Sequence, residues 1–197
     1  MRTAEIKRKT KETDISLKLQ LSNLTTSTIN SGIAFFDHML MSMAKHGRFY
    51  LQLECKGDIE IDAHHSVEDI GICLGKAFKE ALGEKNGIVR FGQAIIPMDE
   101  VLTLVGVDIS GRYHFGLSGV EFNGSINNYS EELTEEFLKA FAVNAGINLH
   151  VKVLSGENRH HIHESIFKSV GVALYRASII DPMLDNQVMS TKGVLEN

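Results

Sequence analysis

The pattern His-His-x-x-Glu occurs twice in this chain, at residues 64–68 and 160–164. The first residues of the two copies are 96 positions apart, which is close to half of the 197-residue length. Similarity at a fixed spacing indicates that one structural unit is repeated. We therefore predict two similar halves, at about 1–88 and 89–181, followed by a tail over 182–197.

Both halves show the same order of expected elements: strands, an amphipathic helix, another strand, and a helix that begins at the motif. Alternating apolar residues predict half-buried strands, and apolar residues three or four positions apart predict helices with one buried face. The helix before the second strand is expected to end near Gly47 in the first half and near Gly146 in the second. Two strands, over 102–107 and 113–117, are expected to be joined at Ser110-Gly111. The other expected segments are strands over 15–21, 51–55 and 147–153 and helices over 36–43, 70–81, 133–141 and 166–174. Two such halves suggest two small sheets that share one helical layer.

The composition excludes several classes of protein. The chain is 43% hydrophobic and 23% charged, with 25 acidic and 20 basic residues, so its net charge of −5 disfavours a broad nucleic-acid-binding face. No apolar run approaches the roughly 18 residues of a membrane span, and the beginning of the sequence lacks the apolar segment of a secretory signal. Cys55 and Cys73 lie in apolar segments, which does not suggest a disulfide framework. We therefore expect a cytoplasmic protein without nucleic-acid or membrane partners.

The repeated motif is suited to binding metal ions. Residues four apart share one face of a helix, so His64 with Glu68, and His160 with Glu164, can each hold one ion. The second histidine of each motif lies about 100° further round the helix and is better placed for another ion. Each half is therefore expected to contribute to two sites, or to sites shared with a neighbouring subunit. Imidazole and carboxylate ligands without thiolate favour Mn, Fe, Zn or Ni; we expect Mn(II), with Zn as the main competitor.

At these motifs the chain resembles the imidazoleglycerol-phosphate dehydratases, enzymes of histidine biosynthesis. The matching segments are Asp62–Gly71, Gly156–Lys168, Phe36–Leu40, Lys11–Thr13, Asp108–Arg112 and Ser190–Gly193. The resemblance covers almost the whole chain and implies a single dehydratase domain over 1–197. It implies an α+β fold made by internal duplication, with helices sandwiched between two four-stranded sheets. It also implies trimers assembled into a 24-subunit cage, with two Mn(II) ions per active site at subunit interfaces.

The resemblance also implies roles for individual residues. The implied metal ligands are His38, His64, His65, Glu68, Glu136, His160, His161 and Glu164. The implied substrate-binding residues are Glu12, His38, Arg90, Arg112, Lys168, Ser190 and Lys192. Glu136 occupies the position in the second half that His38 has in the first, and His150 is the alternative ligand for that site. Asp37 and Asp69 are expected to orient metal-bound imidazoles.

The implied reaction converts imidazole glycerol phosphate to imidazole acetol phosphate. The carbon that loses its proton has no adjacent carbonyl, so the imidazole ring must supply the electronic assistance. A metal-bound imidazolate would expel the hydroxyl group, and two metals suit the two ring nitrogens. Glu12 and His46 are the candidates for acid–base catalysis, and the residues alone leave open which is the acid and which the base. The phosphate group calls for cationic side chains and NH donors.

Three other functions remain open at this point. A non-catalytic metal-binding cage would need the paired motifs but no phosphate-binding residues. A metal-dependent sugar-phosphate hydrolase would release phosphate, whereas a dehydratase retains it in the product. A nucleic-acid-binding protein is also conceivable for two small α+β halves, although the negative charge disfavours it.

Overall fold

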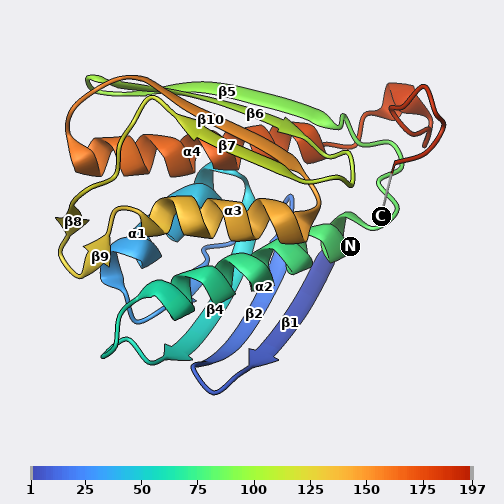
Figure 1. Ribbon diagram of the computed structural model, residues 1–197. Coiled ribbons are helices and arrows are strands. Elements are labelled where there is room, and N and C mark those ends of the chain that lie inside the picture. Colours follow the sequence, from blue (N-terminus) through green and yellow to red (C-terminus); the bar gives the residue numbers. More distant parts are fainter. Residues whose placement is uncertain (1, 196–197) are drawn as a thin grey trace.

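Four helices lie between two four-stranded sheets in the computed structural model, which describes residues 2–195 (Figure 1). The elements of the first half are β1 (Thr3–Lys9), β2 (Thr13–Leu21), β3 (Thr28–Asn30), α1 (Ala34–His46), β4 (Phe49–Gly57) and α2 (His64–Leu82). Those of the second are β5 (Phe91–Met98), β6 (Val101–Asp108), β7 (His114–Ser118), β8 (Ser125–Ile126), β9 (Tyr129–Ser130), α3 (Leu133–Ala145), β10 (Asn148–Ser155) and α4 (Arg159–Ser178). A short 3₁₀ turn, Pro182–Leu184, follows α4. The expected α+β sandwich is confirmed.

The two sheets have the same strand order. The first runs β1-β2-β4-β3 and the second β5-β6-β10-β7, and in each the last pair of strands is parallel while the others are antiparallel. Equivalent elements therefore occupy equivalent places, as an internal duplication requires. The small β8-β9 hairpin is an addition in the second half, between β7 and α3.

The sheets differ from the sequence prediction in two respects. The two strands expected to be joined at Ser110-Gly111 are β6 and β7, and the chain does connect them there, but they are not neighbours in the sheet because β10 lies between them. The edge strands β1, β3 and β5 were not predicted. An edge strand is only partly covered, so its apolar alternation is weak, and β5 also contains Gly92 and Pro97, which are uncommon inside strands.

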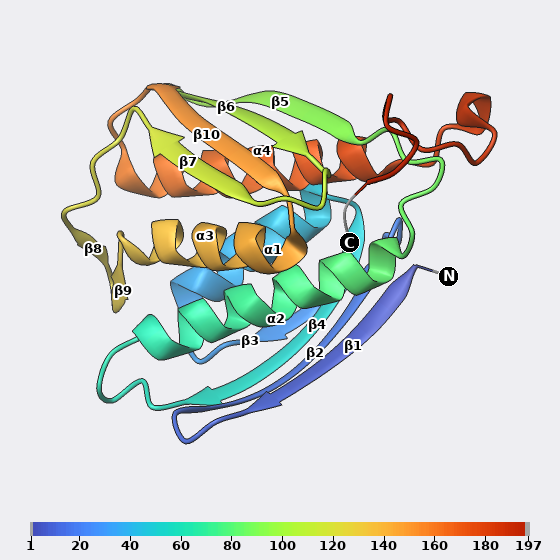
Figure 2. The same ribbon diagram turned by 45° about the vertical axis from the view of Figure 1, so that its right-hand side comes forward.

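In the helical layer, each helix of the first half packs on a helix of the second half. The helix α1 packs on α4, and α2 packs on α3, so each pair contains one helix from each half (Figure 2). Glycines allow the close approach: a β-carbon on Gly75 would lie 2.6 Å from the carbonyl oxygen of Phe141, and one on Gly171 would lie 2.4 Å from that of Met43. This exchange of helices brings residues of both halves to a common place.

Each helix buries one face against the sheet of its own half and another against its partner helix, and one apolar core includes residues of both halves. Gly47 and Gly146 follow the last residues of α1 and α3, as expected, and Gly146 adopts the left-handed conformation that favours glycine (φ 66°). Among residues 2–195, no helix combines the length and the apolar character needed to cross a bilayer.

Candidate metal centre

Three predicted ligands from both halves meet at the start of α4. His38 lies on α1, and His160 and Glu164 lie one turn apart on α4. The Nε2 atom of His38 is 3.6 Å from Oε2 of Glu164, and Nε2 of His160 is 3.3 Å from the same oxygen. Within residues 2–195 this is the one group of three or more histidine, cysteine or acidic side chains whose ligand atoms all lie within 4.8 Å of one another. The α1–α4 pairing thus joins residues that are more than 120 positions apart.

The donor set and spacing of this cluster fit a divalent transition metal. Ligand atoms held about 2.1 Å from one ion lie roughly 3–4 Å from each other, and the two measured separations fall in that range. Two imidazole nitrogens and one carboxylate oxygen are ligands that Mn(II), Fe(II) and Zn(II) all accept. The three residues therefore fit the kind of ion that the motif predicted.

The carboxylate of this cluster is held in its charged form. Partial burial acts to raise the pKa of Glu164, but the nearby Lys168 ammonium and His38 bring that pKa below its ordinary value. The Nζ atom of Lys168 is 3.0 Å from Oε1 of Glu164. Lys168, expected to bind substrate, therefore lies beside a ligand of the cluster, with Met98 on its other side at 3.6 Å.

A second group of motif residues lies at the start of α2. Nε2 of His64 is 3.9 Å from Oε2 of Glu68, one turn further along the helix. Nε2 of His65 lies 3.9 Å from Oε1 of Glu12, which follows β1. The helices α2 and α4 begin at the same end of the helical layer (Figure 1), but in one chain these residues do not belong to the His38 cluster.

Two polar side chains at equivalent positions bond backbone NH groups at the start of the motif helices. The side chain of Asn158 accepts a hydrogen bond from the backbone NH of His161, and that of Asp62 accepts one of 2.7 Å from the backbone NH of His64. Asp62 and Asn158 are themselves 96 residues apart, so the repeat extends to these residues before the helices. Such bonds satisfy free NH groups in the first turn, where the histidines must be held in place.

The second histidine of each motif is oriented by a carboxylate that the sequence did not reveal. Nδ1 of His65 lies 3.1 Å from Oδ2 of Asp58, and Nδ1 of His161 lies 3.0 Å from Oε2 of Glu100. These hydrogen bonds are the main cause that raises the pKa of each histidine, and the bond from His161 helps to lower the pKa of Glu100 to about 2. In both cases Nε2 is left to face a ligand, as in carboxylate–histidine–metal arrangements.

Asp37 and Asp69, expected in that orienting role, have other partners. Asp69 accepts hydrogen bonds from Arg8 and from Thr13, at 2.9 and 2.6 Å, and Asp37 accepts one of 2.8 Å from the backbone NH of Ser31. That prediction was wrong because Asp69 faces the first sheet and Asp37 is bonded to the loop that precedes its own helix. Asp58 and Glu100 lie in loops at strand ends, and no helical spacing links them to the motif.

The two candidates for the remaining ligand lie elsewhere in one chain. Glu136 lies on α3 with its Oε2 3.8 Å from Nζ of Lys139. His150 is exposed on β10, between the buried Leu149 and Val151, so it points away from the helical layer. Glu136 is thus on the same layer as the motif helices, whereas His150 is on the opposite face of its sheet.

Four predicted phosphate-binding residues line one cavity of about 200 Å³. Arg90, Arg112, Ser190 and Lys192 surround it, together with Ser110, Thr191, Val194 and Leu195. Arg90 binds both carboxylate oxygens of Asp108, at 2.7 and 3.1 Å, and donates to the carbonyl oxygen of Met189 at 2.8 Å. The arginine therefore joins the tail after α4 to the end of β6, through a backbone group that does not depend on the side chain at 189.

Two other histidines, His46 and His163, make contacts within the fold and not with the metal cluster. His46 is the last residue of α1, and its Nδ1 lies 2.8 Å from the carbonyl oxygen of Ser42 in the same helix. It is eight residues from His38, about 12 Å along the helix axis. His163 is fully buried, bonds Thr134 through Nδ1 at 2.8 Å and stacks on Phe122; burial lowers its pKa to about 4. A neutral, enclosed imidazole is part of the core.

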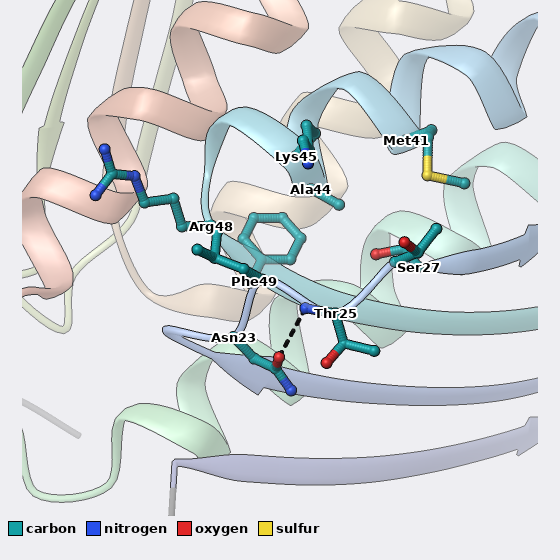
Figure 3. Close-up of a pocket in the computed structure, with 10 residues that line it drawn as sticks. Asn23, Thr25, Ser27, Met41, Ala44, Lys45, Arg48 and Phe49 are labelled. Atoms are coloured by element: carbon teal, nitrogen blue, oxygen red, sulfur yellow. Dashed lines mark hydrogen bonds between the residues drawn. The ribbon is translucent and has the colours of Figure 1, made fainter.

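A separate hollow of about 270 Å³ lies beside the end of α1. It is lined by a loop from Asn23 to Ser27 and by apolar atoms that include Met41, Ala44 and Phe49 (Figure 3). The backbone NH of Thr25 donates to Asn23 Oδ1 at 2.8 Å. None of the predicted site residues lines it.

Comparisons with known proteins show which family this chain is similar to. Residues 31–174 match the family model described as imidazoleglycerol-phosphate dehydratase. Proteins of that name from Leptospira biflexa and Acetivibrio thermocellus are 52% and 51% identical, over 96% and 98% of this chain and 96% and 99% of theirs. The crystal structure of the Staphylococcus aureus enzyme matches with a TM-score of 0.81 at 34% identity, covering 89% of this chain and 97% of that one. The Pyrococcus furiosus structure matches with 0.82 at 38%, covering 96% and 100%.

Proposed function

Because this chain belongs to the imidazoleglycerol-phosphate dehydratase family, which consists of hydro-lyases, we propose that it converts imidazole glycerol phosphate to imidazole acetol phosphate in histidine biosynthesis. The observation that carries the proposal is the cluster of His38, His160 and Glu164, which the two halves build together. A phosphate-sized cavity lined by arginine, lysine and serine side chains supports the same substrate.

The proposed reaction depends on Mn(II), with two ions per active site. His38, His160 and Glu164 would hold one ion, and His64 and Glu68 would contribute to another, with His65, His161 and Glu136 as further ligands. When bound, a divalent cation lowers the pKa of the substrate's imidazole and makes its deprotonated form accessible. The low pKa of Glu164 is suited to this role, because the ligand is charged without having to lose a proton.

The chain's own residues would orient the substrate and move protons. Arg90, Arg112, Ser190 and Lys192 would bind the phosphate, which fixes the other end of the substrate relative to the motif helices. Glu12 is exposed beside His65, where its carboxylate would exchange a proton with the reacting carbon or hydroxyl. His46 would be its acid–base partner. Because His46 lies at the far end of α1 from His38, it would act in a site completed by another subunit.

We further propose trimers that assemble into a 24-subunit cage in the cytoplasm. The second motif group and the His38 cluster are separate in one chain, and contact between subunits would bring them to one active site. Both cysteines are buried free thiols, which suits a reducing compartment. Sedimentation analysis tests the assembly, and a stable monomer with full activity would contradict it.

The decisive experiment measures metal content and product together. Purified protein is stripped of metal, reloaded with Mn²⁺ and given imidazole glycerol phosphate. We expect about two Mn²⁺ per subunit and formation of the acetol phosphate without release of inorganic phosphate. Activity that survives complete metal removal contradicts the metal role; phosphate release identifies a hydrolase, and no turnover leaves a metal-binding cage.

A matched pair of variants links the cluster to the activity. Glu164→Gln keeps the shape of the side chain but removes the charged ligand, so turnover and about one Mn²⁺ per subunit should be lost. Glu135→Gln makes the same change on an exposed position of α3 and should leave both unchanged. Equal behaviour of the two variants would exclude Glu164 as a ligand.

A further inference from the structure

Two histidines outside the proposed active site lie together on the outer face of the second sheet. His114 on β7 and His150 on β10 come from neighbouring parallel strands, and their ring centroids are 4.9 Å apart with the planes tilted by 31°. Both side chains are exposed. The helices cover only the opposite face of this sheet, so the pair faces away from the metal centre described above (Figure 1, Figure 2).

Glycines leave an open space between the two rings. His150 is paired in register with Gly116 on β7 and with Gly106 on β6. A β-carbon on Gly116 would lie 3.5 Å from Nδ1 of His150 and 3.6 Å from Nε2 of His114, so one nitrogen of each ring lies near the same point. A β-carbon on Gly106 would meet nothing within 4 Å. The space above Gly116 is therefore bordered by the two nitrogens, and the space above Gly106 is not.

We propose that His114 and His150 form a surface site for one divalent transition-metal ion, located above Gly116. Exposed imidazoles rotate freely on the nanosecond timescale, so both lone pairs can turn to one ion without movement of the strands. Water would complete the coordination. Two imidazoles and no carboxylate favour Cu²⁺, Ni²⁺ or Zn²⁺ over Mn²⁺ or Mg²⁺, which prefer oxygen ligands. The site is thus chemically distinct from the carboxylate-containing cluster around Glu164, and it does not depend on the proposed dehydratase function.

Equilibrium dialysis of the full-length protein against Ni²⁺, with bound nickel counted per subunit, tests the site. The motif histidines also bind Ni²⁺, but they are unchanged in every variant, so the difference from wild type reports the outer face. His114→Gln and His150→Gln should each lose one equivalent of Ni²⁺ or bind it at least about tenfold more weakly. Retention of the wild-type binding curve by either histidine variant overturns the proposal.

The two glycines supply a matched control. Gly116→Ala keeps both imidazoles but fills the space between their nitrogens, so the same equivalent should be weakened or lost. Gly106→Ala adds the same methyl group to the same face, where nothing is displaced, and should bind as wild type does. Wild-type Ni²⁺ binding by Gly116→Ala refutes the placement of the ion above Gly116. An equal loss of Ni²⁺ in Gly106→Ala refutes the site, because the loss would then come from disturbance of the sheet rather than from the histidine pair.

Discussion

Replacement of Arg159 by methionine should destabilise the start of α4, where the metal cluster begins. Arg159 is the first residue of α4, and its Nε donates to Oε1 of Glu131 at 2.7 Å, while Nη2 bonds the other carboxylate oxygen and the carbonyl of Glu121. The side chain of Glu131 is only 2% exposed, whereas that of Arg159 is 36% exposed. Without the arginine, a carboxylate shielded from water keeps only backbone donors within the described part of the chain, the NH of Gly124 at 3.2 Å and that of Asn123.

The expected magnitude follows from this asymmetry. Removing one partner of a fully buried ion pair costs about 3–5 kcal/mol, and we expect roughly 2–3 kcal/mol for Arg159→Met because the pair is partly exposed and backbone donors remain. Glu131→Gln should cost only about 1 kcal/mol, since the arginine that it leaves behind can be hydrated. Replacing Glu131, the more deeply buried partner, should therefore reduce stability less than replacing Arg159.

The loss should also depend on pH. In the wild type, the hydrogen bond from Arg159 lowers the pKa of Glu131, so the stability it provides is present above the unfolded carboxyl pKa and is lost as pH falls through the folded value. Without Arg159, burial is left to raise that pKa above its unfolded value. The folded variant then binds a proton more readily than the unfolded chain, and its deficit relative to wild type should shrink between pH 7.5 and 5.5.

Urea unfolding at one fixed protein concentration measures these differences, because an oligomer's stability depends on concentration. The wild type and the variants Arg159→Met and Glu131→Gln are compared at both pH values. Other titrating groups are common to all three proteins and cancel in the differences. A larger loss in Glu131→Gln than in Arg159→Met, or a deficit of Arg159→Met that is the same at both pH values, would refute the reasoning.

Two further variants test the site and the helical layer. Glu100→Gln removes the carboxylate that is the main cause of the raised pKa of His161. This pKa should fall in an NMR titration, and Mn²⁺ should bind about 10–100-fold more weakly in equilibrium dialysis. Unchanged metal affinity would exclude the orienting role of Glu100. Gly75→Ala improves helix propensity by about 1 kcal/mol but places a methyl group against the backbone of α3 at Phe141, so thermal unfolding should show a net loss of about 1–3 kcal/mol; a higher melting temperature would contradict the close packing.

Local patterns were sufficient where the chemistry is local. The spacing of His160 and Glu164 on one helix face, the glycines that end α1 and α3, and the repeated order of elements were all predicted from neighbouring residues. Spacing alone did not reveal that His38 would join the second motif, because this depends on the pairing of α1 with α4. Asp58 and Glu100 gave no signal, since a loop residue has no periodicity that points to its partner.

The amino-acid sequence by itself determined that this chain is duplicated, that each half carries a histidine–glutamate pair on a helix, and which faces are buried, because these properties depend on periodicities of two and 3.6 residues. Only the tertiary structure decided which helices of the two halves pair, that β10 separates β6 from β7, and which carboxylates orient His65 and His161. Those contacts join residues far apart in the chain, and they are selected by packing of the whole core rather than by any local preference.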